Sequence, residues 1–174
     1  MLTFDIAFNR LILSEGKFSN DRNDPGNWTG GRVGVGSLNG TNFGLAASTY
    51  PDIDLKNLTL DAAKQIYYRD WWLKLGADEL PAPIIQDLWD FAINSGMSNS
   101  KRALQRAVGV ADDGQFGAVT LAKIKAMDTA QVIIAFNAQR IRYYTSLSTF
   151  PTYGKGWMNR VAQQLDYAII DLQK

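Results

Sequence analysis

The chain contains no cysteine and no histidine. Without cysteine it can form no disulfide, no zinc–thiolate site and no cysteine nucleophile. Without histidine it can build neither a Ser-His-Asp triad nor the histidine-bearing zinc sites of many amidases and peptidases. For a hydrolase, these two absences leave carboxylate chemistry as the natural option.

Long apolar runs and a charge surplus are also missing. No run approaches the roughly 20 apolar residues of a membrane span. The start of the chain lacks a basic segment and carries Asp5, so we expect no signal peptide and no membrane insertion. With 18 basic and 17 acidic residues, the formal charge of +1 gives no case for nucleic-acid binding.

What is present suits one compact, mainly α-helical domain. The 174 residues are 46% hydrophobic, enough for a core without disulfides or structural metals. Apolar spacing and capping residues predict helices over 3–14, 59–72, 81–96, 98–108, 117–127, 129–147 and 157–172, with a short helical piece over 45–50. No internal repeat or linker is found, and we expect a monomer.

Glutamate is scarce, because Glu15 and Glu79 are the only two in the chain. Glu15 follows the first predicted helix and precedes Gly16, which suits a helix end. A carboxylate at that end meets the negative pole of the helix dipole, which disfavours its ionised form. This environment suits a general acid. A solvated terminal glutamate without function is the alternative.

Residues 14–44 form a long glycine-rich segment with aromatic residues, typical of a functional loop. Asp24 lies nine positions after Glu15 within it. One protonated and one ionised carboxyl group are what glycosidic hydrolysis requires. Asp24 before Pro25 could instead be a turn former. A calcium-binding EF-hand loop is excluded because Pro25 occupies a ligand position.

The segment also resembles a known family. It reads EGKFSNDRNDPG and later TNFG, which is similar to the EGG-aromatic-x-N-D-P-x-D-x-GG-x-T-x-x-G pattern of glycoside hydrolase family 108, the phage and prophage N-acetylmuramidases. The resemblance extends from about Phe8 to Val161. It implies that Glu15 is the catalytic acid, Asp24 the second carboxylate and Thr41 the third site residue.

Two departures from that pattern bear on the site. Lys17 replaces the second glycine, and an insert over about residues 28–40 separates Asp24 from Thr41. The insert makes Thr29 a rival for the threonine role. Alternating residues around Val33 and an Asn-Gly turn at 39–40 predict one or two β-hairpins there.

Further residues are candidates for substrate binding. They are polar or aromatic side chains of the loop and of two predicted helix ends, namely Trp28, Asn42, Phe43, Tyr50 and Asn94. For Asn94, helix capping is an equally good interpretation. The paired Trp71 and Trp72 could stack on sugars, but helix core and rim are the more common places for such a pair.

Two patterns in the second half of the chain have structural alternatives. Gln105, Asp113–Gly114 and Thr120 resemble a peptidoglycan-binding region, about 98–165, that accompanies the family. The same pattern would join two helices in any protein. Arg140 and Arg142 with Tyr143 and Tyr144 predict a solvated face with extended arginines rather than a ligand site.

The sequence therefore predicts a lysozyme-like, mainly α-helical domain over 1–174 with a small β-hairpin element in the active-site loop. Residues 1–80 would form a catalytic lobe and 81–174 a helical lobe. The resemblance implies hydrolysis of the β-1,4 bond between N-acetylmuramic acid and N-acetylglucosamine in bacterial peptidoglycan, without metal or cofactor. A chitinase and a non-catalytic wall-binding or secretion-assisting protein are the alternatives. An endolysin would stay in the host cytoplasm until a holin lets it reach the wall.

Overall fold

The computed structural model of the chain describes residues 3–12 and 18–173, so that Glu15 lies outside the described residues. The fold is mainly helical with one small antiparallel hairpin, as predicted. The chain divides into two compact units. We call Asp5–Arg69 the loop unit, and Asp70–Lys174, together with the residues up to Phe4, the helical unit.

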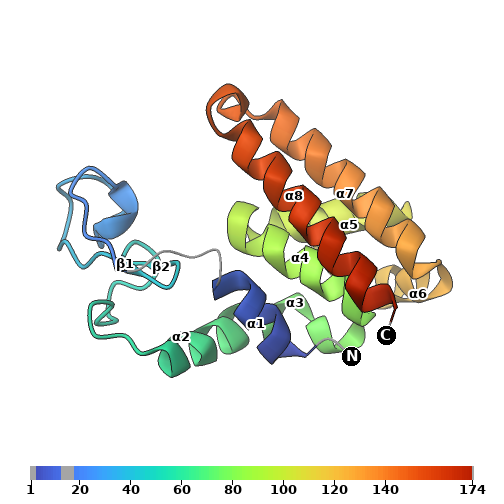
Figure 1. Cartoon of the computed structure of the whole chain (residues 1–174), viewed down its shortest axis with the longest axis horizontal. Coiled ribbons are helices and arrows are strands. Elements are labelled where there is room, and N and C mark those ends of the chain that lie inside the picture. Colours follow the sequence, from blue (N-terminus) through green and yellow to red (C-terminus); the bar gives the residue numbers. More distant parts are fainter. Residues whose placement is uncertain (1–2, 13–17, 174) are drawn as a thin grey trace. The chain divides into compact units, whose positions relative to one another are not determined.

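The loop unit holds two helices and a long irregular segment between them (Figure 1). Helix α1 (Phe4–Ile12) buries Ala7, Phe8 and Leu11, the face that the apolar spacing predicts. The segment contains a short 3₁₀ helix, η1 (Pro25–Asn27), and strands β1 (Thr41–Asn42) and β2 (Leu45–Ala46). Helix α2 (Leu60–Tyr67) closes the unit.

Capping and ring packing fix α2 within the loop unit. Thr59 is its N-cap, as predicted, and its Oγ1 accepts a hydrogen bond from the Ala62 amide at 3.2 Å. The ring of Tyr67 lies 5.9 Å from that of Phe8 on α1. A π-helical segment, η2 (Tyr68–Trp72), follows, and the unit boundary falls within it.

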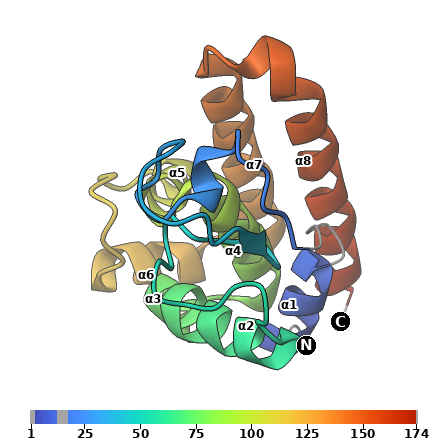
Figure 2. The same cartoon turned by 90° about the vertical axis from the view of Figure 1, so that its left-hand side faces the viewer.

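The helical unit is built around α4 (Ala82–Ser95), which is buried on nearly every face. The neighbouring helices are α5 (Met97–Val108), α7 (Thr129–Ser146) and α8 (Phe150–Leu172), and all three pack against α4. Both views show α7 and α8 lying side by side (Figures 1 and 2). The smaller elements are α3 (Leu73–Leu75), η3 (Ala77–Glu79) and α6 (Ala118–Ala126).

Aromatic packing fills this core. The Phe91 ring lies 5.9 Å from Phe136 and 5.5 Å from Tyr144. Trp72 is only 4% exposed and meets Trp89 edge-on at 5.5 Å, which confirms the core interpretation for this tryptophan. Trp71 is half-buried.

Three local predictions are wrong. Residues 45–50 form β2 and a turn, because backbone pairing with β1 outweighs the helical propensity of a short alanine-rich piece. The two-residue hairpin turn is Phe43–Gly44 and not Asn39–Gly40. Helix α8 begins at Phe150 rather than at Trp157, since Pro151 is tolerated in a first helical turn.

The prediction for Arg140 is also wrong. Its side chain is fully buried and pairs with Asp90, which also accepts a hydrogen bond from Arg160 Nε at 2.8 Å. Asp87 lies 3.9 Å from the Arg140 guanidinium. The burial of Arg140 could not be read from its neighbours in the sequence, because its two acidic partners lie on a different helix, α4.

Candidate active-site loop

Asp24 is placed by the turn that it caps. Its Oδ1 accepts a hydrogen bond from the Gly26 amide at 2.8 Å, and it is the N-cap of η1. The side chain is exposed, and Oδ2 makes no hydrogen bond to any residue that the structure describes. One carboxylate oxygen thus orients the group while the other faces solvent. The turn-forming role and a catalytic role are compatible.

Asn27 is the central residue of this loop, although it is not among the site residues predicted from the sequence. Its side chain is fully buried. Nδ2 donates to the Asp21 carbonyl at 3.0 Å, and Oδ1 accepts from Thr41 Oγ1 at 2.7 Å. Its carbonyl accepts from the amides of Asn39 and Gly40, both at 3.0 Å. Asparagine is a common turn former in glycine-rich loops, so no sequence pattern distinguished Asn27 from the other asparagines of this loop.

Thr41 is held on both its backbone and its side chain. Its amide and carbonyl pair with Ser19 at 2.8 and 2.9 Å, which ties β1 to the segment that follows residue 17. Its hydroxyl donates to Asn27, so the hydroxyl oxygen keeps lone pairs with which to accept a hydrogen bond. The loop therefore links Asp24, Asn27 and Thr41 through η1 and one side-chain hydrogen bond.

Thr29, the rival of Thr41, belongs to the insert. The insert leaves and rejoins the loop at the Trp28–Leu38 bridge. Thr29 Oγ1 accepts from the Ser37 amide at 2.9 Å, and its own amide donates to the Ser37 carbonyl at 3.0 Å. Val33 and Val35 lie at the exposed tip, which forms turns rather than strands. These contacts give Thr29 a role in closing the insert.

The β1–β2 turn contains an unusual residue. Phe43 has φ 49° and Gly44 has φ 78°, the two positive values of a type I′ hairpin turn. A non-glycine residue in this region costs about 1–2 kcal/mol. The Phe43 carbonyl accepts a hydrogen bond from the Tyr67 hydroxyl at 2.9 Å. The hairpin is thereby attached to α2.

The other proposed binding residues take different places. Asn42 is buried, and its Nδ2 donates to the Leu55 carbonyl at 2.8 Å. Trp28 is half-buried, with its indole N–H donating to the Arg22 carbonyl at 2.9 Å. Tyr50 is half-buried at the end of the turn after β2. Asn94 is an exposed residue of the helical unit, and its Nδ2 donates to the Asp90 carbonyl at 2.8 Å within α4.

The proposed peptidoglycan-binding pattern in the helical unit has a structural basis. Gln105 is buried, and its Nε2 donates to Asp113 Oδ1 at 2.7 Å and to the Gln115 carbonyl at 2.8 Å. Its Oε1 accepts from the Gly114 amide at 2.8 Å. These bonds fix the turn between α5 and α6, which accounts for the spacing of the pattern without a ligand.

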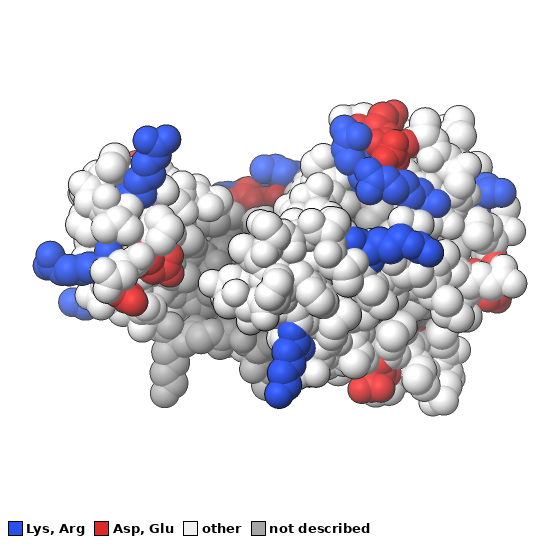
Figure 3. All heavy atoms as spheres, turned by 90° about the horizontal axis from the view of Figure 1, so that it is seen from above, with Lys and Arg blue, Asp and Glu red and all other residues white. Residues whose placement is uncertain are grey.

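We also searched the described residues for surface charge patches and for groups of metal ligands. On the face in Figure 3, lysines and arginines stand in small groups separated by uncharged surface, with acidic residues among them. Residues 3–12 and 18–173 contain no group of three or more acidic side chains that could hold a metal ion. In the same part of the chain, no helix has the length and apolar character to cross a membrane.

Comparisons with known proteins agree with the predicted family. The family Glycosyl hydrolase 108 matches residues 8–96, which include the whole glycine-rich loop and end after α4. The solved structure of SagA from Brucella abortus is 31% identical, with a TM-score of 0.83, over 98% of this chain and 96% of that chain. A search among curated proteins finds no match. The chain belongs to glycosyl hydrolase family 108 and is a glycoside hydrolase.

Proposed function

We propose that this protein is a muramidase that hydrolyses the β-1,4 bond between N-acetylmuramic acid and N-acetylglucosamine in peptidoglycan. Glu15 is the general acid, and Asp24 with Thr41 positions the attacking water. The family membership supports glycoside hydrolysis. The observation that carries the residue assignment is the loop centred on Asn27, which fixes Thr41 and the turn that Asp24 caps.

The proposed chemistry uses one proton donor and one acceptor. Glu15 gives its proton to the bridging oxygen as the bond to the anomeric carbon breaks. Water adds to that carbon and gives a proton to Asp24 Oδ2, the oxygen that Gly26 leaves open. Thr41 Oγ1 accepts the second hydrogen of the water. Room for a water between two carboxyl groups corresponds to a separation of about 6.5–9.5 Å and to inversion of the anomeric centre.

The test compares the two glutamates of the chain. Glu15→Gln removes the proton donor and keeps the size of the side chain, so release of reducing ends from purified peptidoglycan should fall by at least about a hundredfold. Glu79→Gln is the matched control, because Glu79 is an exposed residue of η3 in the helical unit. Thermal unfolding of both variants should match that of the wild type.

The same assay separates the alternatives. Mass analysis of the fragments should show N-acetylmuramic acid at the new reducing end, and NMR of fresh product should show the α-anomer. Cleavage of chitin oligomers in preference to peptidoglycan would assign a chitinase. Undiminished clearing of wall by the Glu15→Gln variant would disprove the role of Glu15.

We further propose that the protein acts as an endolysin. In this role it remains in the host cytoplasm until a holin opens the membrane, and it then reaches the wall. Expression in a bacterial host with and without a holin tests this order. Lysis should require both proteins and should be lost with the Glu15→Gln variant.

A further inference from the structure

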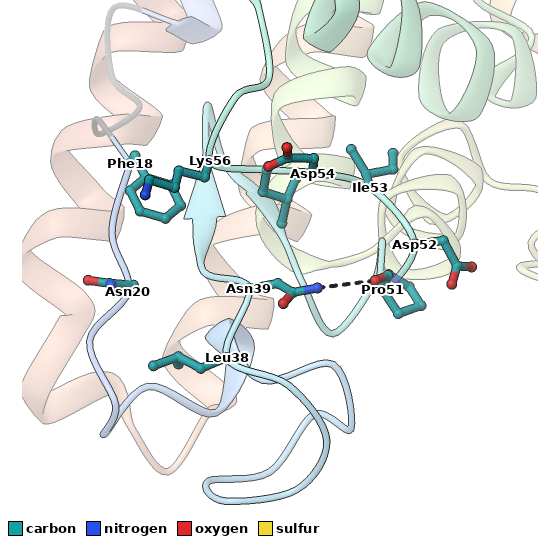
Figure 4. A pocket seen from close by; sticks show the side chains of 10 residues that line it. Phe18, Asn20, Leu38, Asn39, Pro51, Asp52, Ile53, Asp54 and Lys56 are labelled. Atoms are coloured by element: carbon teal, nitrogen blue, oxygen red, sulfur yellow. Dashed lines mark hydrogen bonds between the residues drawn. The ribbon is translucent and has the colours of Figure 1, made fainter.

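The loop unit contains a cavity of about 550 Å³. None of the candidate site residues described above lines it. Figure 4 shows that three segments line it, 18–20, 38–39 and 51–56. This volume is within the range of about 300–1,000 Å³ typical of ligand sites. The cavity lies entirely within one compact unit, so one body carries its whole wall.

The wall of the cavity is held in place by close contacts. A Cβ on Gly40, whose φ is +81°, would come within 2.7 Å of the Phe18 ring and 2.6 Å of the Ser19 carbonyl. Gly40 therefore allows the ring to lie against the backbone. On the other side, Asn39 Nδ2 donates to the Pro51 carbonyl at 3.3 Å and joins two of the lining segments (Figure 4).

The cavity and the Thr41 hydroxyl lie on opposite faces of the same ribbon. Ser19 and Thr41 are bridge partners, so their side chains point to one face. Side chains alternate along an extended chain, so Phe18 and Asn20 point to the other face, where the cavity is. A group in the cavity is thus separated from the Thr41 hydroxyl by the ribbon itself.

Charges of both signs line the cavity. Asp52 and Lys56 lie at opposite ends of the 51–56 segment (Figure 4), and neither forms a salt bridge with a described residue, although the charge of Lys56 acts on the nearby Asp54 carboxyl. Asp54 between them is engaged, because Asn57 donates to both of its carboxylate oxygens, at 3.2 and 2.8 Å. These hydrogen bonds, first that of the Asn57 side chain, lower the pKa of the Asp54 carboxyl.

A neutral sugar can hydrogen-bond to a carboxylate or an ammonium group, but only a ligand that carries charges of both signs can form ion pairs with Asp52 and Lys56 together. The stem peptide of peptidoglycan has both kinds of complement, because its diamino acid carries an ammonium group and its backbone carries carboxylates. We propose that this cavity binds the stem peptide of peptidoglycan, with Lys56 facing a carboxylate of the peptide and Asp52 facing its ammonium group. The proposal rests on the proposed muramidase function, because only then is the peptide linked to the substrate.

The experiment uses the full chain and two substrates, peptidoglycan with its stem peptides and the same glycan stripped of peptides by an amidase. Asp52→Asn and Lys56→Met should each raise KM on intact peptidoglycan about three- to fivefold, the worth of one exposed charge pair, with kcat unchanged. Neither should change KM on the stripped glycan. Lys123→Met and Asp166→Asn, exposed residues of the helical unit, are the matched controls.

A second measurement is independent of catalysis. A synthetic L-alanyl-γ-D-glutamyl-diaminopimelate tripeptide, titrated into the wild type, should shift the backbone NMR signals of residues 51–56, and less so in the two variants. Equal rises in KM on both substrates, or no shift at 51–56, would overturn the proposal. If the muramidase assignment itself is wrong, the wild type will release no reducing ends from either substrate, while the titration still reports on the cavity.

Discussion

At the scale of single residues, the loop depends on a buried asparagine more than on its acidic groups. Asn27 connects three stretches of chain, the one at Asp21, the one at Thr41 and the one at Asn39–Gly40. A buried amide group whose partners are all present fixes a loop that has few apolar contacts. The orientation of the Thr41 hydroxyl follows directly from this residue.

We predict that Asn27→Ala lowers both stability and activity. The change leaves the Asp21 carbonyl and the Thr41 hydroxyl without their partner, at a cost of about 1–3 kcal/mol in the free energy of unfolding. Since Thr41 is no longer oriented, kcat on peptidoglycan should fall about ten- to a hundredfold. Urea unfolding and the reducing-end assay measure the two effects.

The control for this prediction is Asn23→Ala in the same loop. Asn23 is exposed, and among the described residues its side chain forms a hydrogen bond only to Asp21, two positions earlier, at 3.2 Å. This variant should lose less than about 0.5 kcal/mol, as is usual for surface changes. Equal effects of the two variants would contradict a special role for Asn27.

At the scale of elements, the β1–β2 hairpin has a phenylalanine at the first turn position, where the positive φ favours asparagine or glycine. Asn-Gly is the preferred pair for a type I′ turn, and Phe43-Gly44 takes its place here. Strained residues of this kind often occur at functional sites. Phe43 is half-buried, so part of its ring remains available to a ligand.

We predict that Phe43→Asn leaves the unfolding temperature within a few degrees of the wild type and raises KM on peptidoglycan several-fold. The asparagine relieves the positive φ, which offsets the loss of partly buried apolar surface. Gly44→Ala is the opposite change, because it places a side chain at φ 78° and should cost about 1–2 kcal/mol. A large loss of stability in Phe43→Asn with unchanged KM would make the ring purely structural.

Helix α4 brings two aspartates into the core of the helical unit, and they differ in their environment. Burial raises the pKa of the Asp87 carboxyl to about 7, although the charge of Arg140 and a hydrogen bond from Asn137 act in the opposite direction and lower this pKa. Asp90 accepts from both Arg140 and Arg160. Asp90 is therefore the main counter-charge of the buried arginine.

We predict that stability falls as the pH rises from about 4 to about 7. The pKa of Asp87 is raised in the folded chain above its ordinary value of 3.8. Over that window the unfolded chain has released the proton while the folded chain keeps it, so ionisation favours unfolding. Asp87→Asn should remove most of this slope and leave the variant at least as stable as the wild type above neutral pH.

The matched change on the same helix is Asp90→Asn. It leaves Arg140 buried without its ion-pair partner and should cost about 3–5 kcal/mol, as is typical when one member of a buried pair is removed. Thermal unfolding of both variants across the pH range measures the difference. Similar losses in the two variants would show that the aspartates share the role.

At the scale of the whole molecule, the net charge predicts how strongly the activity on an anionic cell wall depends on salt. A formal charge of +1 gives little long-range attraction, and the charged groups of both signs are interspersed on the face in Figure 3. Activity on purified wall should therefore change less than about twofold between low ionic strength and about 0.15 M salt. A steep fall with salt, measured by turbidity clearing, would instead indicate binding through a local basic patch.

The features that depend on interactions between neighbouring residues were predictable from the sequence. The apolar period of α1, the apolar run of α4 and the Thr59 cap of α2 follow from neighbouring residues alone, and the family was recognisable from the motifs EGKFSNDRNDPG and TNFG. Composition also restricted the chemistry, because a chain without histidine or cysteine has few nucleophiles and metal ligands to offer. The helical class and the family were therefore determined by the sequence itself.

Only the tertiary structure decided the roles that depend on distant partners. Arg140 looked like a surface residue until Asp87 and Asp90, about 50 positions earlier on α4, surrounded it in the core. Asn27 became central only through Thr41, 14 positions later. The burial and hydrogen bonds of a polar side chain depend on which segments fold against it, and no local pattern in the chain records that choice.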